Sequence, residues 1–328
     1  MRKYYKNKND QVDKISKLYL RQKYSIKYLF LLSYTIFICE THTTNDSKIK
    51  KKLVNSKHIF TFWEPHQKIP GYLKLCIKTW KKILPEYEII IIDYNNIKYY
   101  LEESILSIIF KMKMKLSIQA DAIRVALLKK FGGIWMDADT ILLNREFLIE
   151  LKDFDLIMFG DQKKEIQHIG FIYAKKDTSL INDWFEGIIN NINSTERILI
   201  MKSNNRDIEW KNTLKKVNSW YFLGNGIIDP ILKNASKKNF LRLDKFKMNV
   251  FPEINFFQNN LSDYTLMYQK FYFRKGEPKE IISKSKGIIL LHNSWTPKKY
   301  KKMTEAKFLK QNILLSKLLF EILHNTVE

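Results

Sequence analysis

Residues 117–139 constrain this chain more than any other stretch, because a helix, a strand and two acids follow one another there. Ser117 to Phe131 has apolar residues at helical spacing and predicts an amphipathic helix. Gly132 and Gly133 end this helix, since glycine accepts the left-handed backbone that closes a helix at little cost. The apolar run at 134–136 that follows predicts a short buried strand.

Two acids, Asp137 and Asp139, stand at the end of this predicted strand. Side chains alternate along an extended chain, so residues two apart share a side and can together clamp a divalent cation. Mg²⁺ and Mn²⁺ accept such carboxylate oxygens and leave room for substrate phosphates. Paired acids also occur by chance on solvated loops, but those are not usually preceded by a buried segment. We therefore expect a cation site that faces the ligand crevice of an α/β sheet.

Asp121 and Arg124 lie three residues apart, on one face of the predicted helix. The alternative to a functional role is a surface ion pair, which would be worth well under about 1 kcal/mol. The apolar neighbours Ile118, Ala122 and Ile123 indicate burial instead, and a buried unpaired charge is costly. The pair is therefore expected to face a ligand.

Strand-like and helix-like segments alternate along the chain, which predicts an α/β fold with a mostly parallel central sheet flanked by helices. The unbroken apolar run at 88–93 is typical of a parallel strand covered on both faces. The other predicted strands cover 58–63, 154–159, 169–174 and 287–291, and the other predicted helices cover 71–83 and 179–192.

With 328 residues the chain can bury a full core, and we expect one catalytic domain. A hydrophobic content of 45% excludes general disorder. The formal charge of +23 predicts anionic partners such as nucleotides, phosphates, nucleic acid or acidic lipid headgroups, although biased codon usage explains the many lysines equally well. Two cysteines in unrelated contexts favour a reducing compartment, and hence a cytoplasmic location.

Residues 1–57 are predicted to form a basic, partly helical N-terminal extension, and residues 58–328 the catalytic domain. Residues 1–27 carry nine Lys or Arg against two Asp, and a mostly apolar run of 12 residues follows at 28–39. A spanning helix needs about 20 apolar residues, so three interpretations stay open. They are an interfacial anchor, a signal-anchor, and a helix packed on the domain.

The whole stretch 117–139 resembles the signature of sugar-transfer proteins that carry an Asp-x-Asp motif. These proteins include glycosyltransferase family 32, capsular polysaccharide synthesis proteins and, more distantly, the large clostridial glucosylating toxins. The resemblance runs from about 58 to 296 and is strong only in the signature. It implies a GT-A fold, with a Rossmann-like sheet, a nucleotide-sugar donor, for which a UDP-sugar is expected, and a bound Mn²⁺ or Mg²⁺ ion.

The resemblance also implies roles for single residues. Asp121 and Arg124 would contact the ribose or sugar of the donor. Asp137 would contact the ribose or sugar and reach the metal through water, whereas Asp139 would coordinate the metal directly.

The first predicted strand resembles the strand whose end meets the nucleoside in this family. Phe62 and Trp63 end it and offer a flat apolar surface for a base, with ordinary core packing as the alternative, more so for Phe62. Asp93 closes the second strand, and a plain strand-ending role is expected for it. Gly224-Asn225-Gly226, followed by Asp229, is expected to form an ordinary turn.

His292-Asn293-Ser294-Trp295 follows the last predicted strand. In related transferases a late histidine or a Ser-x-Trp loop helps hold the diphosphate and the metal. His292 is therefore expected at the metal, and Ser294 and Trp295 at the donor, with Lys298 and Lys299 as phosphate partners. A structural histidine is the alternative for His292.

Together these features predict a metal-dependent, retaining glycosyltransferase of the hexosyl type, with a role in capsular polysaccharide biosynthesis. The expected acceptor is a glycan, a polysaccharide, a lipopolysaccharide or a lipid-linked saccharide, reached at the cytoplasmic face of the membrane through peripheral contact of the N-terminus. One alternative is a basic protein that binds nucleic acid or a membrane surface, but no nucleic-acid module is recognisable, and no nucleic-acid partner is expected. A toxin-like protein glycosyltransferase is the other alternative.

Overall fold

The structure is a computed structural model and describes residues 57–148, 153–161, 166–202, 208–219, 221–244, 261–282 and 287–325. Two compact units, 1–52 and 53–328, divide the chain, and all described residues belong to the second. The predicted N-terminal extension, with its apolar run at 28–39, lies outside the described residues, and the boundary after residue 57 stays a prediction. Among the described helices, none is both long and apolar enough to cross a membrane.

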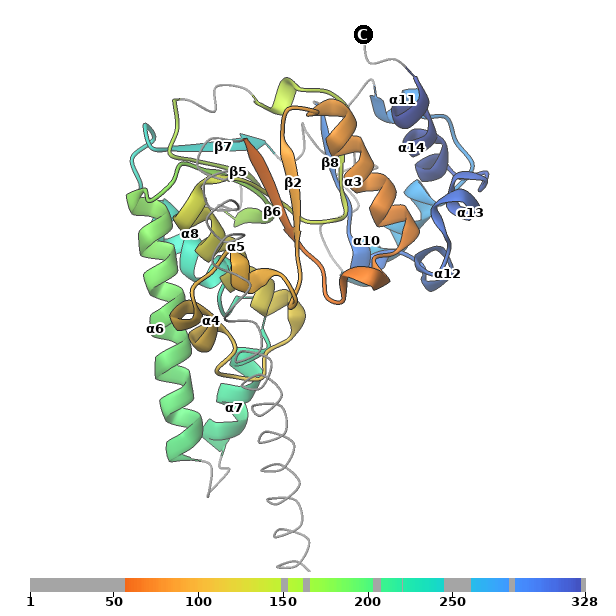
Figure 1. The fold of residues 1–328 in the computed structure, drawn as a ribbon. Helices are drawn as coiled ribbons and strands as arrows, with labels where there is room; N and C mark the ends of the chain where they lie inside the picture. Colours follow the sequence, from red (N-terminus) through yellow and green to blue (C-terminus); the bar gives the residue numbers. More distant parts are fainter. Residues whose placement is uncertain are drawn as a thin grey trace, which may run out of the picture. The chain divides into compact units, whose positions relative to one another are not determined.

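Six strands form the central sheet, in the order β2-β1-β3-β6-β5-β7 (Figure 1). Their bounds are His58–Phe62 for β1, Glu88–Ile92 for β2, Gly133–Met136 for β3, Leu156–Asp161 for β5, Ile166–Ala174 for β6 and Phe240–Asp244 for β7. Strand β1 pairs in parallel with β2 and β3, and β5 pairs in parallel with β7, whereas β6 runs antiparallel to β3 and β5. The predicted α/β fold with a mostly parallel sheet is therefore confirmed.

Helices lie against both faces of this sheet (Figure 1). On one side α3 (Gly71–Ile83) packs against α13 (Glu305–Leu309) and α14 (Leu314–His324), and on the other α5 (Leu116–Phe131) packs against α6 (Ser179–Met201). The remaining helices are short or peripheral. They are α4 (Glu103–Ile109), α7 (Ile208–Val217), α8 (Asn225–Lys233), α10 (Leu261–Tyr272), α11 (Lys279–Ile282) and α12 (Lys298–Lys301).

Two predicted strands take different places from those the sequence suggested. Strand β2 pairs in parallel as expected, but it lies at the edge of the sheet, and Ile89 and Ile91 stay half-buried. Ile90 and Ile92 are buried on one face, and Ile89 and Ile91 on the other pack against core clusters, so both faces of β2 contact the core and one is only partly covered. The last predicted strand, β8 (Ile288–Leu290), leaves the main sheet and pairs antiparallel with β4 (Thr140–Leu142).

The junction between α5 and β3 depends on two glycines with positive φ angles, Gly132 at 67° and Gly133 at 95°. A Cβ atom on Gly133 would lie 2.8 Å from Cδ2 of the buried His58 ring, which itself bonds the Gly132 carbonyl through Nε2 at 3.0 Å. The helix can therefore turn directly into the strand only because neither position carries a side chain. Trp80 of α3 fixes the far side of this region by donating from Nε1 to the Thr140 carbonyl at 2.7 Å.

Replacing Gly133 by alanine should destabilise the domain by about 1–3 kcal/mol, because the new Cβ adds a steric clash to an unfavourable backbone angle. Chemical denaturation of the full chain measures this change. Gly276→Ala is the matched control, since its Cβ would meet only Leu314 at 3.4 Å, an ordinary contact. Equal unfolding midpoints for the two variants would contradict the proposed constraint.

Candidate active site

The two acids lie in a turn between β3 and β4, here called the acid turn (Asp137–Thr140). The Thr140 N–H donates to the Asp137 carbonyl at 3.0 Å. The Asp137 carboxylate accepts from Trp135 Nε1 at 2.9 Å, whereas that of Asp139 accepts from the Asn293 N–H at 2.6 Å. The acids therefore do not lie on an extended strand, as had been expected, since β3 ends at Met136 and the chain turns before β4.

Arg124 of α5 ties three segments together. Its Nη2 lies 2.9 Å from Asp121 Oδ1 and 3.6 Å from Asp137 Oδ1. Its Nη1 donates to the Ile169 carbonyl, and its guanidinium lies over the Trp135 ring, 5.0 Å from the centroid. Asp121 and Arg124 are 3% and 4% exposed, so the predicted burial of this pair is confirmed. Planar guanidinium donors hold the helix, the acid turn and β6 in one arrangement.

Strand β6 bulges where it passes the acid turn. The register between β5 and β6 shifts so that residues 169–171 have no partner on β5. The Gly170 carbonyl in this bulge accepts from the Asp137 N–H at 2.7 Å. A Cβ atom on Gly170 would lie 2.6 Å from His168 Cε1 and 2.9 Å from Asp137 Oδ2. His168 therefore borders the site, although no local pattern singled it out, because a bulge is visible only once the strands are paired.

The segment after β8 lies against the acid turn, as its place after the last predicted strand suggested. Backbone bonds hold it there, since the Leu291 N–H donates to the Asp139 carbonyl at 3.1 Å, next to the Asn293 bond to the same residue. The imidazole of His292 packs on Trp295 with ring centroids 4.0 Å apart, and its centroid lies 6.0 Å from that of His168. His292 and Trp295 are thus brought to the acids from 150 residues away in sequence.

The predicted base-binding residues differ in their surroundings. Phe62 is buried and packs against Tyr94 with ring centroids 5.9 Å apart, which fits a core role. Trp63 is half-buried and borders the same hydrophobic cluster as Trp295. Asp93 accepts from backbone N–H groups two and three residues further on, at 2.9 Å each, so its expected strand-ending role is confirmed. Trp63 is the better placed of the two aromatic residues.

Three lysines and a serine follow along the same segment. Ser294, Lys298 and Lys299 are exposed, and Lys299 lies over the Tyr300 ring at 4.7 Å. Lys301, which the sequence did not single out, is the lysine whose charge acts on Asp139. Burial lowers the pKa of Lys301, and the Asp139 carboxylate opposes that shift. Lys301 therefore provides a positive charge near Asp139 that could contact an anionic ligand.

Burial strongly affects the acids of the site. It raises the pKa of Asp121 to about 7, against the opposing effect of Arg124, and Asp121 Oδ2 is buried without a hydrogen-bond partner among the described residues. Burial also raises the pKa of Asp139 to about 7, repulsion from Asp137 adds to this, and the Asn293 N–H opposes it. A hydroxyl donor beside Asp121 would satisfy its unpaired carboxylate oxygen, and a cation beside Asp139 would stabilise its ionised form.

The donor set of the acid turn fits Mg²⁺ or Mn²⁺, because these ions keep several waters or phosphates and need only one or two protein carboxylates. In the part of the chain that the structure describes, no three His, Cys, Asp or Glu side chains form a metal-binding group. Asp137, Asp139 and His292 therefore do not constitute a closed protein cage, and His292 as a ligand stays a prediction.

The Gly224-Asn225-Gly226 segment is not an ordinary turn, as had been expected, but the start of α8 beside the site. A Cβ atom on Gly224 would lie 3.1 Å from Asp121 Oδ2. Asn225 is buried and donates to the Gln167 carbonyl of β6 at 2.7 Å. The expectation failed because this contact joins α8 to residues far away in sequence.

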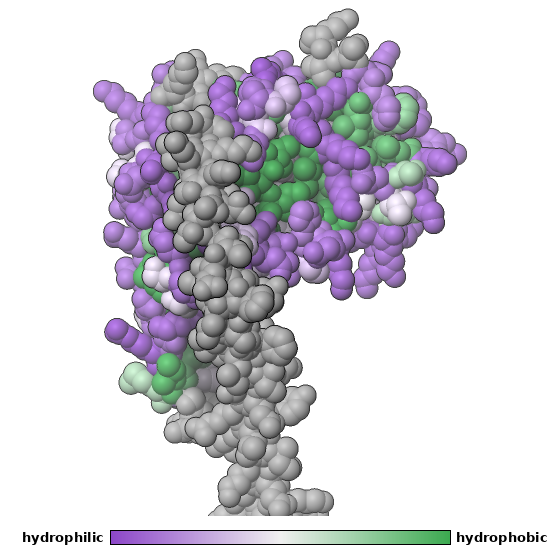
Figure 2. All heavy atoms as spheres, in the orientation of Figure 1, coloured by the Kyte–Doolittle hydropathy of each residue, from purple (hydrophilic) through white to green (hydrophobic). Residues whose placement is uncertain are grey.

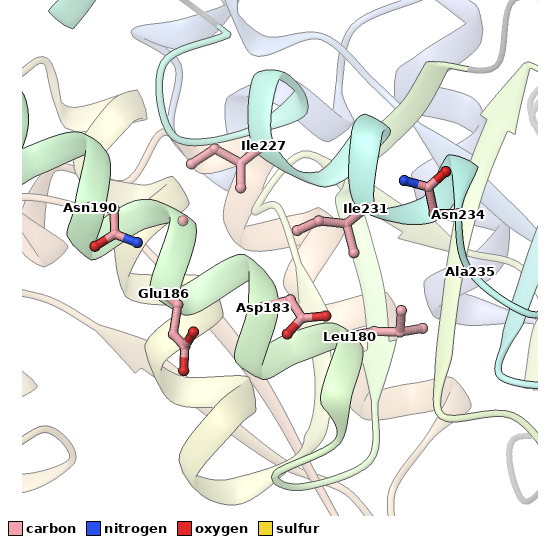
Figure 3. Close-up of a pocket in the computed structure, with 9 residues that line it drawn as sticks. Leu180, Asp183, Glu186, Asn190, Ile227, Ile231, Asn234 and Ala235 are labelled. Carbon is pink, nitrogen blue, oxygen red and sulfur yellow. The ribbon is translucent and has the colours of Figure 1, made fainter.

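A separate groove of about 540 Å³ lies between α6 and α8 (Figure 3). Gly187 allows the two helices to approach closely there, because any side chain at this position would clash: a Cβ atom would lie 2.5 Å from Ile227 Cγ2. Its lining comprises Leu180, Asp183, Glu186, Gly187, Asn190, Ile227, Ile231, Asn234 and Ala235. It includes none of the predicted site residues, so the groove and the acid turn are distinct features.

The chain is similar to one protein family and to a number of solved structures, of which two follow. No curated protein matches the chain. The PaToxG glycosyltransferase is 17% identical, with 58% of this chain and 76% of that chain covered and a TM-score of 0.35. A glycosyltransferase involved in the glycosylation of the major capsid of PBCV-1 is 12% identical, with 76% and 99% covered and a TM-score of 0.34. Nothing about activity is concluded from likeness at this level.

The sequence pattern of a family described as "Capsular polysaccharide synthesis protein" matches residues 6–249. The match spans most of the chain and includes α5, the acid turn and the β6 bulge. It confirms the family resemblance found in residues 117–139. The chain therefore belongs to the capsular polysaccharide synthesis protein family.

Proposed function

We propose that this protein transfers a sugar from a nucleotide-sugar donor, with a UDP-sugar expected, to a glycan, polysaccharide or lipopolysaccharide acceptor. The reaction depends on Mn²⁺ or Mg²⁺, retains the anomeric configuration and takes place in the cytoplasm. The observation that carries the proposal is the junction of Arg124 with Asp121, Asp137 and the β6 bulge, next to the contact between Asp139 and Asn293. Family membership supports the same reaction class.

The donor would lie across the acid turn. Asp121 Oδ2, which has no hydrogen-bond partner in the described part of the chain, would accept a hydrogen bond from a hydroxyl of the ribose or sugar, and Arg124 would keep that carboxylate in place. Trp63 would offer its half-buried ring to the base. Asp139, with Asp137 beside it, would hold the divalent cation, which supplies neutralisation of the diphosphate when bound.

Cleavage of the donor separates a cation-like sugar from an anionic diphosphate, so two charges need stabilisation. Lys301, which acts on Asp139, and Lys298 at the start of the same helix would neutralise the departing diphosphate, together with the segment at His292. No covalent nucleophile stands out, so we infer attack on the same face, with the departing diphosphate taking the proton of the acceptor hydroxyl. The carboxylates of Asp121 and Asp137 would stabilise the positive charge that develops on the sugar.

Asp139→Asn should lower Mn²⁺-dependent hydrolysis of a UDP-sugar by about 100-fold or more, because the amide keeps the size of the side chain but loses the charge that binds the metal. A screen of several nucleotide sugars with Mn²⁺, read as released nucleotide, provides the assay. Asp183→Asn, an exposed acid on α6, is the control and should keep parental rates. Equal metal-dependent rates in Asp139→Asn and the parent would refute the site assignment.

Mn²⁺ affinity should depend on pH because the metal competes with the proton on Asp139, whose pKa is raised to about 7. Below that value the proton must leave before the metal binds, so affinity should fall about tenfold for each pH unit on the acid side and level off above about pH 7. Calorimetric titration of the full chain with Mn²⁺ measures this. An affinity that is constant from about pH 5 to about pH 8 would contradict the proposed role of Asp139.

A further inference from the structure

Three large apolar side chains are exposed where α6 ends and α7 begins. Ile200, Met201 and Ile208, here called the apolar tip, are 63%, 81% and 77% exposed, more than any other large hydrophobic side chain among the described residues. Apolar surface is visible at this lower end of the two helices in Figure 2. Isolated exposed apolar residues are common, but three together at one end of a helix pair indicate an interaction site.

Exposed cationic side chains lie on the same two helices as the apolar tip. Four of them are exposed and form no ion pair within the described ranges: Arg197, Lys211, Lys215 and Lys216. Two acids of the described parts of these helices are already paired, Glu196 with Lys111 and Glu209 with Lys202. The surface around the tip is therefore positive, and it complements an anionic partner.

The geometry of the two helices supports the tip as a protruding element. Helix α6 has 23 residues, which is about 35 Å of helix, and it extends away from the sheet with α7 packed beside its far part (Figure 1). The ion pair between Lys202 and Glu209 ties the end of one helix to the start of the other. Trp210 lies half-buried one residue further on.

We propose that the apolar tip inserts into the interface of a membrane that contains anionic lipids. Ile200, Met201 and Ile208 would enter the boundary between headgroups and acyl chains, while the surrounding lysines and Arg197 contact the headgroups. An anionic lipid surface suits this arrangement, because it offers an apolar layer to the three exposed side chains and negative headgroups to the unpaired cations on the same two helices. The inference is independent of the proposed sugar transfer.

The test is sedimentation of the full chain with phosphatidylcholine vesicles, with and without phosphatidylglycerol. The parent should bind the anionic vesicles preferentially, and added salt should weaken binding. The triple variant I200S/M201S/I208S should bind them about tenfold or more weakly, since it loses the inserted apolar area. The variant K211E/K215E/K216E should lose the preference for anionic lipid. Leu266→Ser and Phe320→Ser, each at a side chain that is 50% exposed elsewhere, should bind like the parent.

Every variant keeps the N-terminus, so a loss of binding is attributable to the tip. Unchanged vesicle binding by the triple variant would overturn the proposal. If that variant does not fold, as judged by thermal unfolding, Met201→Ser alone should still weaken binding by a few-fold, and parental binding would count against the proposal. Self-association of the parent that the triple variant abolishes, with vesicle binding intact, would assign the tip to a second copy of the chain and would also overturn the proposal.

Discussion

Burial of the Arg124 guanidinium is the constraint on which the candidate site depends, because a buried charge is tolerated only when its hydrogen bonds and countercharges are supplied. Its partners come from three segments: Asp121 on the same helix, the Ile169 carbonyl in the β6 bulge, and Asp137 in the acid turn. One side chain therefore sets the distance between a helix, a strand and a turn. The bulge is needed for this, since a regular β6 would direct the Ile169 carbonyl into the ladder with β5.

Two acids of the candidate site, Asp121 and Asp139, are costly to ionise without a ligand. Burial makes ionisation of Asp121 and Asp139 costly, and Asp137 adds repulsion to both. The chain as a whole carries a formal charge of +23, and Lys301 brings part of that charge near Asp139. Clustered carboxylates next to a lysine suit a ligand that carries both kinds of charge. The proposed ligand, a metal-bound diphosphate joined to a neutral sugar, has this character.

Elements with strong local signals could be predicted closely. Helix α3 begins and ends at the predicted residues, and α5 begins one residue earlier than predicted, because apolar periodicity and the glycines at 132 and 133 define them without distant contacts. The places of β2 and β8 could not be predicted, since an apolar run shows that a strand is buried but not which strands lie beside it. His168 was missed for the same reason: its approach to Asp137 arises from a shift of register between paired strands.

The sequence by itself determined the α/β class, the order of the main elements and the chemical types of the site, namely two neighbouring acids, an acid and an arginine on one helical face, and a late histidine and tryptophan. Local spacing decides these properties, and spacing is written in the chain. Only the tertiary structure decided that the acids occupy a turn, that Arg124 reaches β6, and that Asn293 donates to Asp139. These contacts join residues separated by up to 154 positions, and their geometry depends on packing, which no local pattern specifies.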